Sequence, residues 1–144
     1  MKMKTIDAAV AYNALNAAKL TKMDDADKVK VLKTLRNLKS VAVPYFDFVS
    51  DAEEKMKPEG YDNMQRKAQQ WQAEGQKTTL TAAEQLELDR FFKQYRKSVD
   101  EAAREEGDKE VEVKIEKLSE DAFQKLVASN DWKAEELLKL DIML

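Results

Sequence analysis

Carboxylates and lysines are the side chains that could do chemistry here, because the 144 residues include no histidine and no cysteine. Imidazole catalysis, disulfides and Cys/His zinc sites are therefore excluded. The acidic run at 105–112 could gather a divalent cation, but a solvated turn explains it more simply. Asp24, Asp25 and Asp27 lack the glycine and the distant glutamate of a calcium loop, and are better explained as residues at the start of a helix. We expect no catalytic residues, no cofactor and no metal site, and predict that the protein is not an enzyme.

A basic stripe is the first candidate for partner binding. Along a predicted helix, Lys28, Lys30, Lys33, Arg36 and Lys39 alternate with apolar positions, and we take Lys28, Lys33, Arg36 and Lys39 as the candidate residues of this stripe. The stripe could contact phosphates, but the net charge of -3 gives no strong positive field of the kind typical of nucleic-acid binders. Residues 1–50 carry nine Lys/Arg and five Asp, and the remaining residues carry sixteen Lys/Arg and twenty-three Asp/Glu. We interpret this asymmetry as attraction between the two parts, within one fold or between copies.

Two tryptophans are the other candidates, because tryptophan is common at the centre of protein interfaces. Trp71 lies in a polar, glutamine-rich segment and is the better candidate for partner contact. Trp132 lies among apolar C-terminal residues and is better explained as part of the core.

The element that positions the basic stripe is a long helix predicted at 25–56. Its apolar residues alternate at steps of four and three, which is the seam of a helix that faces another helix. The seam comprises Val31, Leu35, Leu38, Ala42, Tyr45, Val49, Ala52 and Met56. Four more apolar residues lie beside it: Leu32, Val43, Phe46 and Phe48. Pro44 predicts a kink, and a face this wide predicts more than one partner helix.

Three further segments precede residue 108. An alanine-rich, thin helix is predicted from Thr5, as its cap, to about Leu20. Residues 58–80 are predicted as a linker or a mobile helix. A capping box at Thr81 and Glu84 predicts a second long helix that ends near Gly107 and lies antiparallel to the first.

The pattern changes at 108–144, for which we predict one strand followed by short helices. Val111, Val113 and Ile115 alternate with charged residues, which predicts a half-buried strand at 111–117. The strand could pair with residues 1–4, with residues 77–80 or with another copy of the chain. Ser119 is predicted to cap one short helix, and Asn130 or Asp131 another. The apolar end, 142–144, is predicted to be docked.

The two ends of the chain also resemble a known family. The opening DAAVAYNALNAAKL and the later segments EVEVKIEKLSEDAF and AEELLKLDIML are similar to small phage proteins of unknown function encoded among late, tail-region genes, the family DUF1617. The resemblance implies a phage or prophage origin and a non-enzymatic role in the particle or its assembly. It carries no catalytic residues with it.

Together these features predict one mainly α domain over 1–144: a long kinked antiparallel helical hairpin or bundle, one short strand and small C-terminal helices. The predicted function is a helical, coiled-coil interaction module that forms homo-oligomers, binds phage or host proteins and serves as a phage structural or assembly accessory. The alternatives are a nucleic-acid-binding regulator using the basic stripe, and an inhibitor of a host protein using the acidic run. No secretion signal or membrane-spanning run is evident, so we expect the host cytoplasm or the virion.

Overall fold

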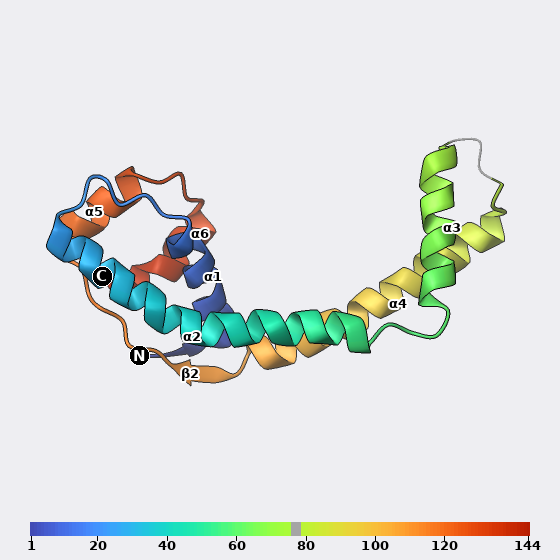
Figure 1. The fold of residues 1–144 in the computed structure, drawn as a ribbon, viewed down its shortest axis with the longest axis horizontal. Helices are drawn as coiled ribbons and strands as arrows, with labels where there is room; N and C mark the ends of the chain where they lie inside the picture. Colours follow the sequence, from blue (N-terminus) through green and yellow to red (C-terminus); the bar gives the residue numbers. More distant parts are fainter. Residues whose placement is uncertain (76–78) are drawn as a thin grey trace. The chain divides into compact units, whose positions relative to one another are not determined.

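The computed structural model describes residues 1–75 and 79–144 and groups the chain into two compact units (Figure 1). Unit 1 comprises residues 1–48 and 104–144, and unit 2 comprises residues 49–103. The sequence predicts a single domain over residues 1–144, whereas the contacts in the structure group the chain into these two units.

The described residues are mainly α-helical, which confirms the predicted fold class. In chain order the elements are β1 (Lys2–Lys4), α1 (Thr5–Asn16), α2 (Asp25–Lys55), α3 (Tyr61–Glu74), α4 (Ala82–Gly107), β2 (Glu110–Glu112), α5 (Glu120–Ala128), α6 (Ala134–Leu140) and the 3-10 helix η1 (Asp141–Met143).

Helix α2 follows the predicted seam and continues through Pro44. Five seam residues are buried: Val31, Leu38, Ala42, Tyr45 and Ala52. Leu35 and Val49 are half-buried, and Met56, which lies beyond the end of α2, is exposed. Helix α4 contacts α2 within each unit: Gly107 lies against Tyr45 in unit 1, and in unit 2 the Tyr95 hydroxyl donates a hydrogen bond to the carbonyl of Glu53.

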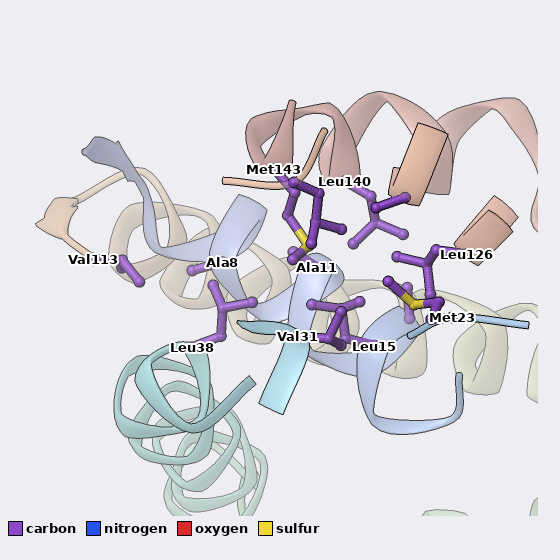
Figure 2. Close-up of a cluster of buried hydrophobic side chains, with 13 residues drawn as sticks. Ala8, Ala11, Leu15, Met23, Val31, Leu38, Val113, Leu126, Leu140 and Met143 are labelled. Atoms are coloured by element: carbon purple, nitrogen blue, oxygen red, sulfur yellow. The ribbon is translucent and has the colours of Figure 1, made fainter. Parts of the chain in front are cut away.

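The core of unit 1 draws side chains from both ends of the chain and from α2 (Figure 2). Its buried members are Ala8, Ala11, Ala14, Leu15, Met23, Val31, Leu38, Val113, Leu118, Ala122, Leu126, Leu140 and Met143. Ala8, Ala11 and Ala14 lie on α1 and make it thin, as predicted, whereas Ala122 lies on α5. The predicted docking of the apolar end is confirmed for Met143, which is fully buried and whose carbonyl accepts a hydrogen bond from the amide of Leu118; Leu144 is 51% exposed.

The predicted strand is correct only in part. β2 pairs antiparallel with β1 of the same chain, with Met3 opposite Val111, so the partner is 1–4; the alternative at 77–80 begins outside the described residues. The Val113 amide still donates to the carbonyl of Met1 at 2.9 Å, and after Val113 the extended chain leaves the sheet. The Glu116 amide donates to the Thr34 hydroxyl at 2.9 Å, and the Asn37 side-chain amide donates to the carbonyl of Lys114 at 2.9 Å. Side chains of α2 therefore replace a strand as the hydrogen-bond partners.

The sequence predicts caps at the starts of four helices, and the structure confirms two of them. The capping box of Thr81 and Glu84 is confirmed, with the Glu84 amide donating to the Thr81 hydroxyl at 3.2 Å. Ser119 is also confirmed, because its hydroxyl accepts from the amide of Ala122. Thr5 begins α1 but does not cap it: its hydroxyl donates to the carbonyl of Lys109 at 2.8 Å, and α1 ends at Asn16 rather than near residue 20.

The prediction that Asn130 or Asp131 caps the last helix is wrong. Helix α6 begins later, and its N-cap is Lys133. The Asn130 side chain instead accepts from the amide of Lys19 at 2.8 Å and donates to the carbonyls of Lys19 and Leu126 at 3.0 and 2.8 Å. It therefore joins the loop after α1 to the end of α5.

The segment predicted as a linker or a mobile helix forms helix α3 over most of its length. Gly60 before the helix and Gly75 after it have φ angles of 83° and 62°. These angles lie in the left-handed region that glycine adopts without a steric penalty. Both boundaries of α3 therefore depend on backbone conformations that favour glycine.

Candidate interaction surfaces

Helix α2 places all four residues of the predicted basic stripe within unit 1. At 100° per residue, Lys39, Arg36 and Lys33 fall within an arc of about 120°. All three are exposed, whereas Lys28 is half-buried and its ammonium lies 3.7 Å from the carboxylate of Asp25. Lys33, Arg36 and Lys39 thus point away from Val31 and Leu38, which face the core.

Exposed apolar side chains lie in the same arc as these cations. Leu32 is 53% exposed, Val29 49% and Val43 37%. We call the set of Val29, Leu32, Lys33, Arg36, Lys39 and Val43 the α2 face. The sequence predicts a second partner helix over Leu32 and Val43, but in the described structure these side chains face outward.

Acidic residues bound the α2 face at both ends. Asp25 and Asp47 are exposed and lie in the same arc as Leu32 and Arg36. With a rise of 1.5 Å per residue, they are about 33 Å apart along the helix, whereas Val29 and Val43 are about 21 Å apart. The positive and apolar region is therefore short, with negative charge beyond it on both sides.

Within one chain, the ion pairs found between the basic and acidic parts do not involve the α2 face. Within the described residues, ion pairs between the first 50 residues and the C-terminal part join Lys4 to Asp108 at 3.5 Å and Asp7 to Lys139 at 2.8 Å. The N-terminal amine lies 2.7 Å from the carboxylate of Glu112. The cations of the α2 face thus remain available to a partner.

The acidic run at 105–112 is divided among several cations. Glu106 pairs with Lys109 at 2.7 Å, while Asp108 and Glu112 pair with Lys4 and the N-terminal amine. The hydrogen bond that the Lys109 ammonium donates to the Glu106 carboxylate raises the pKa of Lys109 above its ordinary value. Over residues 1–75 and 79–144, acidic side chains do not form a group of three or more that could hold a metal ion.

The two tryptophans lie in different surroundings. Trp132 is half-buried and packs against the core of unit 1, beside Asn130. Trp71, on α3, lines a cavity of about 480 Å³ in unit 2, together with Ala68, Leu88 and Phe92. Five of the six predicted residues therefore fall in three places: Lys33, Arg36 and Lys39 on the α2 face, Trp71 beside α3 and Trp132 at the edge of the core. The sixth, Lys28, is half-buried and lies outside the α2 face.

The sequence pattern did not identify two exposed apolar surfaces: the apolar part of the α2 face, and a groove in unit 2 lined by Met56, Met64 and Phe91. Leu32 lies outside the seam that contains Leu35 and Leu38, and this position is the signal that could have indicated an exposed apolar side chain on α2. What the pattern does not contain is whether another part of the chain covers Leu32.

No family model, curated protein or solved structure matches this chain. None of the helices in the described ranges 1–75 and 79–144 combines the length and apolar character needed to cross a membrane. The resemblance to the phage family therefore stays a prediction.

Proposed function

We propose that this protein is a helical interaction module that binds a partner protein through the α2 face. The observation that carries the proposal is the exposure of Val29, Leu32 and Val43 on a helix whose opposite side buries Val31, Thr34 and Leu38 in the core. Covering each half-exposed side chain would contribute about 1 kcal/mol to binding, which is roughly half the value for complete burial. The three side chains form an apolar centre, and cations surround it.

The chemistry of the α2 face favours an acidic partner. Lys33, Arg36 and Lys39 are exposed, and each ion pair they form with a carboxylate would add up to about 1 kcal/mol and speed association. A helix with an apolar stripe flanked by Asp or Glu fits this pattern, since such a helix matches both the apolar residues and the cations.

Nucleic acid fits the same surface less well. A duplex carries phosphate charges along its whole length, so a strand lying along α2 would approach the carboxylates of Asp25 and Asp47 at the ends of the face. Phosphates also gain little from contact with Val29 and Leu32. The bounded, partly apolar face thus supports a protein partner over DNA or RNA.

The alternative function, inhibition of a host protein through the acidic run, has weaker support. Three carboxylates of that run already pair with cations of the same chain. If the resemblance to the phage family is correct, the partner of the α2 face is a component of the particle or of its assembly.

The test is affinity capture from the cells that produce the protein, with four forms of the full chain. Leu32→Ser removes the most exposed apolar side chain of the face, and Arg36→Glu reverses a central charge. Leu138→Ser is the matched control, because Leu138 is 69% exposed on α6, outside the α2 face.

We expect the wild type and Leu138→Ser to retain the same acidic protein, which Leu32→Ser and Arg36→Glu lose. Nuclease treatment should leave the capture unchanged. Equal retention by all four forms would contradict the proposal, and so would retention that nuclease abolishes, which would favour nucleic acid.

A further inference from the structure

Unit 2 has few buried apolar side chains for its size. Among its described residues, only Ala52, Leu88 and Val99 are buried hydrophobics, and helix α3 contains no buried residue. Unit 1, in contrast, has a core of thirteen buried residues. Helical hairpins of this size gain stability from apolar contacts outside the hairpin.

The apolar side chains of unit 2 are mostly large and only half-covered. Tyr61 of α3 lies 5.9 Å from Phe92 and 5.2 Å from Tyr95, measured between ring centroids. Phe91 and Phe92 meet edge to face at 5.4 Å. These rings hold α3 against α4, but they leave part of their surface open to solvent.

An open groove lies on this surface of unit 2. Its volume is about 400 Å³, and its apolar lining comes from Met56, Pro58, Met64, Phe91 and Tyr95. Met56 is 39% exposed, although the sequence places it on the seam of α2. An apolar occupant of the groove would therefore cover both Met56 and the outer side of Phe91.

The rim of the groove carries one charge of each sign. Glu87 and Arg90 line it from α4, together with the neutral Gln94 and Ser98. Both charged side chains are exposed, and neither belongs to an ion pair within the described residues. A rim with no net charge does not select an acidic or a basic partner, in contrast to the α2 face.

We infer that a second copy of this chain covers the groove. In a twofold contact the same surface is used by both copies, and any residue pair across the axis occurs twice. Glu87 of each copy then lies opposite Arg90 of the other, while the apolar linings of the two grooves cover each other. Unit 2 as a whole also permits this contact, because its nine Lys/Arg and eleven Asp/Glu leave it nearly neutral.

The experiment is the mass of the full chain in solution, measured by light scattering over a range of concentrations. We expect the wild type to have twice the mass of one chain. Glu87→Arg and Arg90→Glu each place like charges opposite each other at two positions, and each should raise the dissociation constant about tenfold or more.

An equimolar mixture of these two variants supplies the decisive control. In a mixed dimer the two Arg residues of one chain face the two Glu residues of the other, so the mixture should regain the dimer mass. Leu32→Ser, on the α2 face, should leave the mass unchanged. Circular dichroism would confirm that each variant keeps its helices.

Four results would overturn the inference. These are a wild type that stays monomeric at all concentrations, a dimer that neither charge variant weakens, a mixture that does not regain the dimer, and a dimer that Leu32→Ser dissociates.

Discussion

Thr34 illustrates how a single helix residue can supply a hydrogen bond to the segment that follows a strand. It lies on the buried side of α2, between Val31 and Leu38, and is fully buried although its side chain is polar. Its hydroxyl accepts the hydrogen bond of the Glu116 amide, which would otherwise need a partner strand. The extended segment after β2 therefore packs on a helix, at a point where the alternating sequence pattern predicts more strand.

Replacing Thr34 by Val keeps the shape of the side chain and removes the acceptor. Since the Glu116 amide then loses its partner in a partly buried place, we expect the free energy of unfolding to fall by about 1–3 kcal/mol. Chemical denaturation measures this loss, and amide hydrogen exchange at Glu116 should become faster.

Thr34→Ser is the control for this prediction, because it removes a methyl group and keeps the hydroxyl. It should leave exchange at Glu116 close to the wild-type rate. A Thr34→Val variant as stable as the wild type, with unchanged exchange at Glu116, would contradict the role given to this hydrogen bond.

Helix α2 has three roles in unit 1. It supplies part of the core, it donates and accepts the hydrogen bonds of the extended segment, and it carries the α2 face. Pro44 lies inside it and is exposed. Proline has no amide hydrogen, so the carbonyl of Ser40 cannot receive the usual helical hydrogen bond from residue 44. The seam on both sides of Pro44 keeps the helix continuous.

Pro44→Ala restores that hydrogen bond at a position where the side chain is not packed. We expect the variant to gain about 1–3 kcal/mol of stability, less than the full cost of a proline inside a straight helix. Thermal denaturation followed by circular dichroism measures the gain. A lower melting temperature would show instead that packing around α2 requires proline at this position. Val43→Ala is the control, because Val43 is the exposed neighbour of Pro44 and its replacement removes side-chain contacts without restoring a backbone hydrogen bond.

The elements differ in how far the sequence could predict them. The cap at Ser119 and the box of Thr81 and Glu84 were predictable because donor and acceptor are three residues apart. Asn130 was not, because its partner Lys19 is 111 residues away and the local pattern resembles a cap. For the candidate site, periodicity gives the exposed cations of α2. It does not give the exposure of Leu32 or Met56, which depends on what else the chain places nearby.

For the whole molecule, the two units suggest two separate tasks. Unit 1 has a complete core and presents the α2 face, whereas unit 2 has few buried apolar residues and an open groove with a self-complementary rim. We propose that unit 1 binds the partner and that unit 2 joins copies. Leu32→Ser and Arg36→Glu test the binding of a partner, and Glu87→Arg and Arg90→Glu test the contact between copies, so either proposal can fail without the other.

The central claim is that the α2 face contacts another protein, and site-specific photocrosslinking tests it most directly. A photoreactive residue would replace Leu32 in one form of the chain and the control residue Leu138 in another, and both would be irradiated in the producing cells. We predict a crosslink from position 32 to an acidic segment of a different protein, and none to that protein from position 138. No crosslink from position 32, a crosslink only to another copy of the chain, or equal crosslinking from both positions would contradict the account.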